Sequence, residues 1–405
     1  MKNQAITYSS LEKNIYKSDF YKFDYLKCKD LKDFAICEAL RISQNYKENT
    51  FQITKVKTKT LDIDGDHKYQ FFLSSYPQKL LMRKCARNIS KNFYYNAPDR
   101  NKSIRELKSC VKWGGQQKIY KIDIASYYES LSEQFIVNLI RQSTGISSHT
   151  KEITLALLEQ HWSNEGKGLP RGIEISTPIA NIALETLDKQ VKQHPDCLFY
   201  SRFMDDIIVV SSMSRGNELR TLIKQLLPPN IYLNTAKTKT YLNGEKEIEL
   251  SYLGYDLKIQ GKGKNNRHGY REINVFHSSP KLSKLKDKIF KSFLDYSRTK
   301  NFKLLRDRLE FLSTNRSFKK GKGKYKSGIY YSNSEINDSS KLISIDKYLY
   351  AWIKNEGLFY LKGRCKFSSD EKLELKKINF MAGFTMKIHK RFNYIRQKEI
   401  TNIWR

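Results

Sequence analysis

The chain has 405 residues, of which 74 are Lys or Arg and 42 are Asp or Glu, for a formal net charge of +32. A compact protein with this much positive charge repels itself unless a polyanion neutralises it, so nucleic acid is the expected partner, with a merely solvated basic surface as the alternative. Hydrophobic residues make up 39% and aromatic residues 13%, which excludes a disordered chain and allows two or three subdomains.

The sequence also disfavours a membrane protein and a zinc protein. No apolar run approaches the roughly 18–20 residues of a membrane-spanning helix, and the opening MKNQAITYSS lacks the apolar core of a signal peptide. The six cysteines lie far apart, with no C-x-x-C pair and no His at zinc-ligand spacing. This usage is typical of reduced thiols, so we expect a cytoplasmic protein.

The first part of the chain predicts a mixed segment with one clear hairpin. A helix is expected around LKDFAICEALRIS. The runs FQITKVKTKTLDI and HKYQFFLSS flank the turn-forming Asp64-Gly65-Asp66, which is the pattern of a hairpin with a basic face. Residues 79–93 combine cations with an apolar stripe and predict a helix.

Strands and helices alternate over residues 116–256. The pattern predicts a strand ending at Asp123, a helix from about Ser132, a Gly/Pro-rich loop at 166–172, a helix opening at Thr177-Pro178, a hairpin at Asp205-Asp206, a helix over 216–227 and a strand ending in Tyr252-Leu253-Gly254-Tyr255. A cation-rich turn, GKGKNNRHG, follows at 261–269. Residues 280–405 are expected to be mostly helical and broken by a basic linker, KKGKGKYKSG.

Three aspartates are embedded in apolar runs, IYKIDI (119–124) and FMDDIIVV (203–210). Period-two geometry places Lys121 and Asp123 on one strand face, so neighbouring strands could present Asp123 beside Asp205 and Asp206. Buried acids are costly unless a cation neutralises them. Hard oxygen ligands suit Mg²⁺, and two such ions suit phosphoryl transfer to a 3′-hydroxyl. An Asp-Asp pair in an ordinary turn is the alternative.

Five segments in order resemble the palm motifs of reverse transcriptases. IYKIDIASYYESL resembles motif A, GLPRGIEISTPIANIAL motif B, FMDDIIVV motif C, NIYLNTAKTKTY motif D and SYLGYDL the primer-grip motif E. The resemblance implies an α+β right-hand polymerase fold with an antiparallel palm sheet. It implies an N-terminal segment and fingers at 1–115, a palm with interleaved fingers helices at 116–256, a basic hairpin at 257–279 and a helical thumb or C-terminal RNA- or duplex-binding region at 280–405.

The same resemblance assigns roles at the catalytic centre. Asp123 and Asp205 would bridge two Mg²⁺ ions, Asp206 would support them, and the Ile124 carbonyl would complete the second site; Mn²⁺ is a potential substitute. Lys237 falls where motif D is proposed to protonate the leaving pyrophosphate, with a solvated strand lysine as the alternative.

Nucleotide selection is also implied by the motifs. Tyr128 falls at the steric-gate position and would reject a ribose 2′-hydroxyl; a core tyrosine is the alternative. Gly172 and Ser176 would let the backbone approach the nascent pair. Arg171 replaces the glutamine of retroviral enzymes and could hold a phosphate bidentately, and Phe203 replaces the motif C tyrosine while preserving an aromatic ring.

Further cations and aromatics are candidates for contacts with substrate or nucleic acid, each with a solvated surface as the alternative. For the triphosphate we predict Lys68 and Arg83; for nucleic acid we predict Arg100, Arg105, Tyr252, Gly254, Lys284, Lys288, Lys324, Tyr325 and Lys326. In the last group, aromatic rings could stack on unpaired bases while lysines follow the phosphates.

The P-R-G form of motif B and the C-terminal region are most similar to the bacterial "unknown group" of reverse transcriptases, which includes the defence-associated enzymes, among them a type that pairs two reverse transcriptases with a noncoding RNA. Retron and abortive-infection enzymes are more distantly similar, since Asn96-Ala97 lacks the retron histidine. No ribonuclease H, protease or HNH pattern follows the palm motifs, which disfavours retroviral and group II intron enzymes.

The resemblance implies a template in a structured noncoding RNA, dNTP substrates and an RNA/DNA duplex product, and it allows a second reverse transcriptase, an effector subunit or a second copy as partner. Untemplated or protein-primed synthesis remains open, as does a catalytically silent RNA-binding scaffold.

Overall fold

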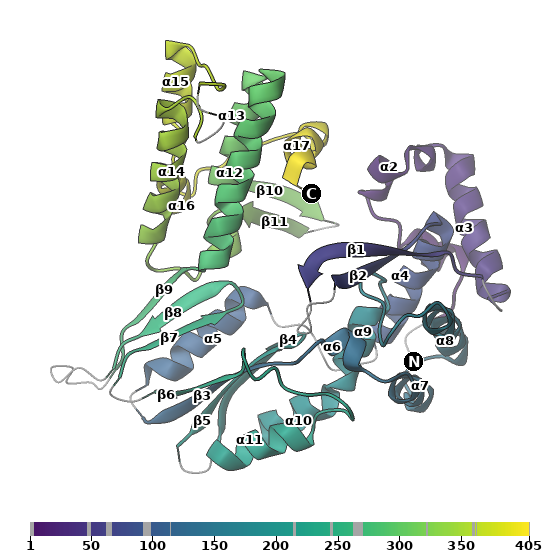
Figure 1. Cartoon of the computed structure of the whole chain (residues 1–405). Coiled ribbons are helices and arrows are strands. Elements are labelled where there is room, and N and C mark those ends of the chain that lie inside the picture. Colours follow the sequence, from purple (N-terminus) through teal and green to yellow (C-terminus); the bar gives the residue numbers. More distant parts are fainter. Residues whose placement is uncertain are drawn as a thin grey trace. The chain divides into compact units, whose positions relative to one another are not determined.

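The computed structural model describes residues 4–46, 50–61, 67–91, 99–113, 115–213, 216–243, 246–261, 270–320, 323–358, 361 and 363–404. The chain divides into two compact units, which we call unit 1 (Met1–Pro98 and Lys118–Tyr241) and unit 2 (Asp99–Gln117 and Leu242–Arg405) (Figure 1). The predicted boundaries follow the order of the chain, whereas the contacts group residues 99–117 with the C-terminal part.

Unit 1 contains residues 118–241 of the predicted palm segment, 116–256, and the N-terminal helices. Its elements are α1 (Tyr8–Glu12), α2 (Asp19–Lys22), α3 (Lys29–Gln44), β1 (Ile53–Leu61), β2 (His67–Leu73), α4 (Tyr76–Ser90), most of β3 (Gln117–Asp123), α6 (Tyr127–Ser130), α7 (Glu133–Gln142), α8 (Ser148–Ser163), α9 (Ser176–Ala183), α10 (Glu185–Gln193), β4 (Cys197–Phe203), β5 (Asp206–Ser212) and α11 (Gly216–Gln225). The strand β6 (Lys239–Asn243) spans the boundary with unit 2.

A four-stranded sheet in the order β4-β5-β3-β6 supports the catalytic motifs. The residues Ile207–Val210 of β5 are fully buried, because α10 and α11 pack against β4 and β5 while the rest of the core covers the sheet (Figure 1). On β3, Ile122 is buried whereas Lys121 and Asp123 are partly exposed, which confirms the predicted faces. The sheet therefore positions the aspartates at the end of β3 and at the start of β5.

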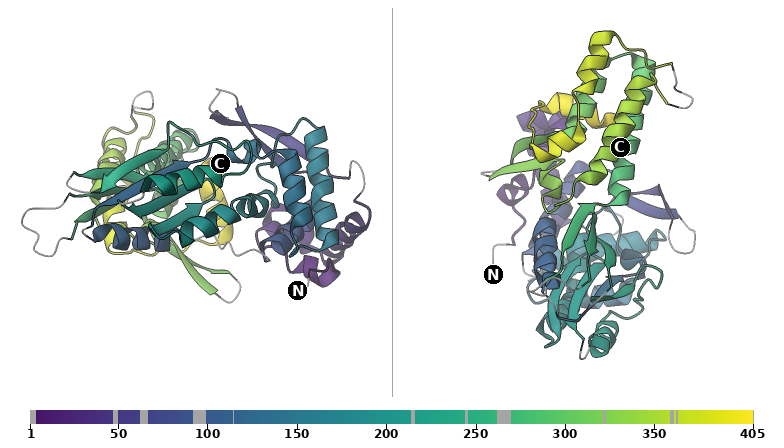
Figure 2. Two further views of the ribbon diagram at one scale, coloured as in Figure 1. Left: turned by 90° about the horizontal axis from the view of Figure 1, so that it is seen from below. Right: turned by 90° about the vertical axis from the view of Figure 1, so that its left-hand side faces the viewer.

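Two helices begin within one residue of their predicted starts. Ser132 caps α7 by accepting a hydrogen bond from the Phe135 amide, and α9 begins at Ser176 with Pro178 in its first turn. The helices α7 and α8 lie side by side (Figure 2) and pack into the same core as β3 and β5. The predicted hairpin is also confirmed, since β1 pairs antiparallel with β2, although its turn at 62–66 lies outside the described residues.

Unit 2 combines a three-stranded antiparallel sheet with helices. Its elements are α5 (Arg100–Lys112), β7 (Ile248–Tyr252), β8 (Tyr255–Ile259), β9 (Ile273–His277), α12 (Ser279–Thr299), α13 (Phe302–Ser313), β10 (Asn315–Lys320), β11 (Gly323–Gly328), the 3₁₀ turns η2 (Tyr331–Asn333) and η3 (Ser340–Leu342), α14 (Ile343–Lys354), α15 (Ser369–Lys376), α16 (Phe380–Thr385) and α17 (Tyr394–Thr401).

Two details of unit 2 bear on the predictions. The β8 and β9 strands pair as the predicted basic hairpin requires, while most of its turn, 262–269, lies outside the described residues. The prediction of a linker at KKGKGKYKSG is wrong, because this segment pairs as the β10–β11 hairpin. Backbone pairing needs no apolar side chains, so a lysine- and glycine-rich strand gives no alternating apolar signal. Among the described residues, no helix is long and apolar enough to cross a membrane.

Candidate active site

The turn between β4 and β5 presents Asp205. Phe203 pairs with Asp206 across the hairpin, so Met204 and Asp205 form a two-residue turn. Met204 has φ 60°, a left-handed conformation that is usual for glycine at the first position of a type II′ turn. A non-glycine residue in this region costs roughly 1–2 kcal/mol. The surrounding contacts therefore hold this turn in a defined shape.

Arg202 is the main contact beneath that turn. Its guanidinium is 1% exposed and lies opposite Asp188 of α10, with Nε donating to Asp188 Oδ1 at 2.7 Å. The Nη1 group donates to the Met204 carbonyl at 3.1 Å and to Asn181 Oδ1, and Nη2 donates to Asp188 Oδ2 and the Asn181 carbonyl. All five N–H groups of an arginine are thereby used. The motif comparison missed this residue, although a cation within an apolar strand predicts a buried acidic partner.

Asp123 is held at the end of β3 by the segment that follows α11. Its carbonyl accepts a hydrogen bond from the Asn234 amide at 2.8 Å, and its amide donates to Thr238 Oγ1 at 3.3 Å. Lys237 Nζ lies 3.6 Å from Asp123 Oδ2. The motif D segment therefore fixes the backbone of Asp123 and places a cation beside its carboxylate.

Asp123 and Asp205 are close enough to repel each other. Burial raises the pKa of the Asp205 carboxyl and the charge of Asp123 adds to the rise, while Arg171 and Lys237 oppose it. A carboxylate with a raised pKa, such as that of Asp205, is stabilised in its charged form by a nearby cation. The structure thus brings together the two acids that the sequence assigned to the metals.

The donor chemistry of this pair fits Mg²⁺, which binds through a few carboxylate oxygens and completes its shell with water and substrate phosphates. Within the part of the chain that the structure describes, no three His, Cys, Asp or Glu side chains gather to hold a metal ion by themselves. Asp206 begins β5 and is partly exposed, and Ile124 forms a bridge with Leu233. Supporting roles for Asp206 and for the Ile124 carbonyl stay predictions.

Tyr128 and Arg171 lie next to the pair formed by Asp123 and Asp205. The Tyr128 hydroxyl is 3.3 Å from Thr177 Oγ1, and the Arg171 guanidinium lies 4.9 Å from the centre of the Tyr128 ring. Glu129 binds Arg171 through both carboxylate oxygens, with Nη2 2.9 Å from Oε2. The acid therefore holds the guanidinium across the tyrosine ring.

The motif B loop packs against the first hairpin. Gly172 has φ 100°, and a Cβ there would lie 2.6 Å from the Phe71 carbonyl oxygen of β2. The Phe71 amide donates to the Arg171 carbonyl at 2.7 Å. Ser176 is 1% exposed and donates to the Pro170 carbonyl at 2.7 Å. Gly172 therefore allows β2 to approach the motif B loop, and the Ser176 hydrogen bond stabilises that loop. Direct contact of either residue with a nucleotide stays a prediction.

One comparison with known proteins matches the middle of the chain to a family model. The family model described as "Reverse transcriptase (RNA-dependent DNA polymerase)" matches residues 68–257, from β2 to β8. The chain carries a reverse transcriptase domain. It is an RNA-directed DNA polymerase, a nucleotidyltransferase, and the four-stranded sheet is the palm of its polymerase fold. No curated protein matches the sequence.

The two residues predicted to contact the triphosphate lie at the start of this reverse transcriptase domain. Arg83 is partly buried, with Nη1 2.6 Å from Asp19 Oδ2 and Nε 3.4 Å from Glu174. Lys68 is on β2, but its side chain lies outside the described residues. The ion pairs give Arg83 an internal role in unit 1, and a triphosphate contact by either cation stays a prediction.

The predicted nucleic-acid contacts near the reverse transcriptase motif E have internal partners. Arg100 donates to the Ser332 carbonyl and lies 5.0 Å from the centre of the Tyr255 ring, while Arg105 pairs with Glu335 at 2.7 Å. Tyr252 is buried, and Gly254 has φ 74° with the Lys281 side chain where its Cβ would lie. Contacts of these residues with nucleic acid are untested.

The remaining predicted contacts lie on α12 and on the β10–β11 hairpin. Lys284 is exposed and Lys288 is half-buried. Tyr325 is 48% exposed, and Lys326 Nζ lies 5.0 Å from the centre of the Tyr331 ring. The side chain of Lys324 lies outside the described residues.

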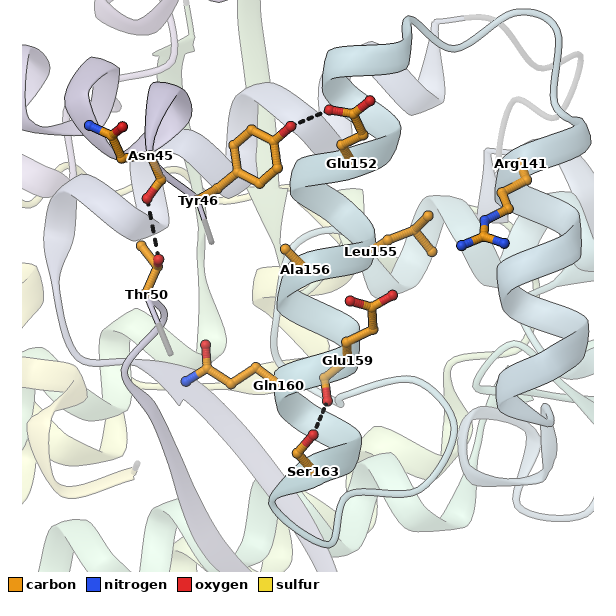
Figure 3. Close-up of a pocket in the computed structure, with 10 residues that line it drawn as sticks. All are labelled: Asn45, Tyr46, Thr50, Arg141, Glu152, Leu155, Ala156, Glu159, Gln160 and Ser163. Carbon is orange, nitrogen blue, oxygen red and sulfur yellow. Dashed lines mark hydrogen bonds between the residues drawn. The ribbon is translucent and has the colours of Figure 1, made fainter. Parts of the chain in front are cut away.

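A wide cavity of about 1280 Å³ in unit 1 is lined by neither Asp123 nor Asp205. Its walls come from α7, α8 and the segment after α3, and Figure 3 shows the Tyr46 hydroxyl directed at the Glu152 carboxylate. Glu159 and Arg141 also line it. These charges of both signs give no clear preference for a phosphate, so the cavity adds nothing to the catalytic site.

Proposed function

We propose that the reverse transcriptase domain uses two Mg²⁺ ions to copy part of a structured noncoding RNA into DNA, in the cytoplasm of a bacterium and in defence against phage. The observation that carries the catalytic part is the approach of Asp123 to the half-buried Asp205, with Lys237 beside Asp123. The net charge of +32 supports a nucleic-acid partner. The defence role rests on the resemblance of the motif B and C-terminal sequences to defence-associated enzymes.

In this proposal, Asp123 and Asp205 hold the ions, which would activate the 3′-hydroxyl and stabilise the departing pyrophosphate. Lys237 is 68% exposed at its side chain and lies beside Asp123, so its ammonium could reach the leaving group and give it a proton. The Tyr128 ring stands beside the catalytic pair and would exclude a 2′-hydroxyl. Arg171 would bind a phosphate after exchanging its contact with Glu129.

The decisive experiment is to isolate the protein with its RNA and to sequence both that RNA and any DNA made from Mg²⁺ and labelled dNTPs. DNA complementary to one region of the bound RNA supports the proposal. DNA without a template in that RNA favours untemplated synthesis, and DNA whose gel mobility changes on protease digestion favours protein priming. Full phage protection by an Asp123→Asn variant would instead identify a catalytically silent scaffold.

Sugar selection depends on the Tyr128 ring. Replacing Tyr128 with alanine is expected to raise the incorporation of rNTPs relative to dNTPs by at least about 10-fold, or ~1.4 kcal/mol of discrimination, because the ring no longer occupies the space of a 2′-hydroxyl. The ratio of kcat/KM for the two substrates measures this effect. Tyr128→Phe keeps the ring and loses only the hydroxyl near Thr177, so it should keep the selectivity. Equal selectivity in all three proteins would contradict the assignment.

Affinity for RNA should depend steeply on salt. Contact with roughly six to ten phosphates would lower the affinity by about 10³–10⁵ between about 50 and 200 mM salt, because each neutralised phosphate releases counterions. Filter binding or fluorescence anisotropy over that range gives the slope. An affinity that stays constant would show that the positive charge does not drive binding.

A further inference from the structure

A second concave site lies wholly within unit 2. It is a cavity of about 320 Å³ enclosed by the first turns of α12, the end of α13, the β10–β11 hairpin and the 3₁₀ turns that follow. Small-molecule sites begin at about 300 Å³, so the cavity suits a single nucleotide. Its apolar wall consists of Leu282, Leu285, Phe311, Leu312, Ile329 and Leu342.

The polar lining of this cavity is strongly cationic. The cations that line it are Arg100, Lys281, Lys284, Lys288 and Arg316, and no Asp or Glu is among the described residues that do. Their contacts are with neutral oxygens, as for Lys281 Nζ at 2.8 Å from Asn333 Oδ1 and Arg316 Nη1 at 2.8 Å from the Phe311 carbonyl.

Two acids of unit 2, Asp287 and Glu335, are paired with cations outside the cavity lining. Asp287 lies 3.1 Å from Lys291, and Glu335 lies 2.7 Å from Arg105. The positive charge of the cavity therefore has no anionic partner within the described lining.

Burial makes this charge costly. It lowers the pKa of Lys281 to about 7, with Arg100 contributing, and lowers the pKa of Arg316 to about 10. The pKa of Lys288 is lowered by burial and by the charges of Arg316 and Lys284. Each shift reports that the charged form is disfavoured, and a bound anion would reverse all of them.

His277 provides an independent indication of a ligand. It is 4% exposed, lines the same cavity, and neither of its ring nitrogens has a hydrogen-bond partner among the described residues. Its ring packs edge-on against Phe384 with centroids 5.4 Å apart. Burial lowers its pKa to about 4, so at neutral pH the ring offers one N–H donor and one acceptor. A buried polar side chain without a partner is destabilising unless a ligand or water satisfies it.

We propose that this cavity is an accessory binding site for one nucleoside monophosphate group. Its phosphate would lie among Arg316, Lys281 and Lys288, and its sugar and base would lie against the apolar wall. Arginine and lysine are the usual partners of phosphate. The group can come from a free nucleotide or from the 5′-phosphorylated end of an RNA. This site is not part of the polymerase centre, and the proposal does not depend on the function proposed above.

The first test measures binding of AMP to the full chain by calorimetry in EDTA, which removes divalent ions from the polymerase centre. The pocket variant Lys288→Gln/Arg316→Gln should bind AMP at least about 10-fold more weakly than wild type. The matched control Arg298→Gln/Lys303→Gln removes the same charge from exposed positions near the C-terminal end of α12 and the start of α13, and it should change the affinity less than about 2-fold. Equal binding by all three proteins, or no binding of AMP, would show that the cavity does not bind a free nucleotide.

The second test compares two RNAs of one sequence that carry either a 5′-phosphate or a 5′-hydroxyl. An RNA end in the cavity predicts tighter binding of the phosphorylated form to wild type and no difference in the pocket variant. If neither RNA end nor AMP distinguishes wild type from the pocket variant, the proposed site does not exist.

A measurement on wild type alone guards against a pocket variant that fails to fold. Lysine acylation followed by mass spectrometry should show Lys281 and Lys288 protected by AMP, while Lys303 reacts equally with and without it. Unchanged acylation of both pocket lysines at saturating AMP would overturn the proposal for the free nucleotide, and the 5′-phosphorylated RNA serves as the second probe. Polymerase activity is not a readout in any of these tests, so the two proposals fail separately.

Discussion

Replacing Asp205 with asparagine is expected to reduce DNA synthesis by more than about 100-fold, because even residues that only support a metal ligand contribute about 10–100-fold. The substitution keeps the size of the side chain and removes the charge that faces Asp123. Primer extension with Mg²⁺ and dNTPs measures the loss. Glu159→Gln makes the same change at an exposed position of unit 1 and should leave synthesis unchanged.

The Asp205→Asn substitution that lowers activity should raise the stability of the folded protein. Burial and Asp123 raise the pKa of Asp205 above its unfolded value, so the folded state loses stability as pH rises from about 4 through the folded pKa. In EDTA the melting temperature of Asp205→Asn should therefore match that of wild type near pH 4 and exceed it towards pH 7. Mg²⁺ should then stabilise wild type more than the variant.

This combination separates a catalytic acid from a structural one. If Asp205→Asn lost activity and melted lower than wild type at every pH, the carboxylate would be a structural element of the turn. If DNA synthesis persisted in the variant, the metal assignment would be wrong.

Replacing Arg202 with methionine is expected to destabilise the palm by about 3–5 kcal/mol, because Asp188 is left buried without its cationic partner. Denaturant unfolding of the single variant measures this loss. The double variant Arg202→Met/Asp188→Leu removes both charges and should recover most of the stability, since buried ion pairs can be replaced by apolar side chains at little cost.

Activity should not recover in that double variant. The Met204 carbonyl loses its hydrogen bond from Arg202 Nη1, and the turn that carries Asp205 loses its support, so we expect synthesis at least about 10-fold below wild type. Lys189→Met removes an exposed partner of Glu185 on the same helix, α10, and should change stability by no more than about 1 kcal/mol. Wild-type activity in the double variant would show that the turn is held by other contacts.

The approach of Asp123 to Asp205 was predictable because both residues stand at the ends of apolar strands within an ordered set of motifs. The faces of β3, the start of α7 and the hairpin at Asp205-Asp206 follow from local rules of alternation and capping. Such rules act within a few residues, so they can be read from the sequence.

The contacts that join distant segments were not predictable in this way. The sequence around Arg202 does not indicate that Asp188 is its partner. The sequence around Gly172 does not indicate that the Phe71 backbone packs against it. The pairing of β10 with β11 depends on backbone hydrogen bonds, and a lysine-rich sequence gives no apolar alternation from which to predict it. The cationic cavity combines α12 with Arg100 and Arg316, which only the folded chain brings together.

The division of unit 2 into two separated stretches has a consequence for making and shortening this protein. The ribosome completes α5, whose Ile104, Leu107 and Val111 are buried in the finished fold, well before it makes β7 to α17, the rest of unit 2. Ending translation after residue 256 would leave Asn101 without Tyr331 and Arg105 without Glu335. A stop codon after residue 241 keeps all of unit 1 but leaves α5 without the rest of unit 2. No stop codon yields unit 2 alone, so shortened versions should expose an orphan helix and be prone to aggregation.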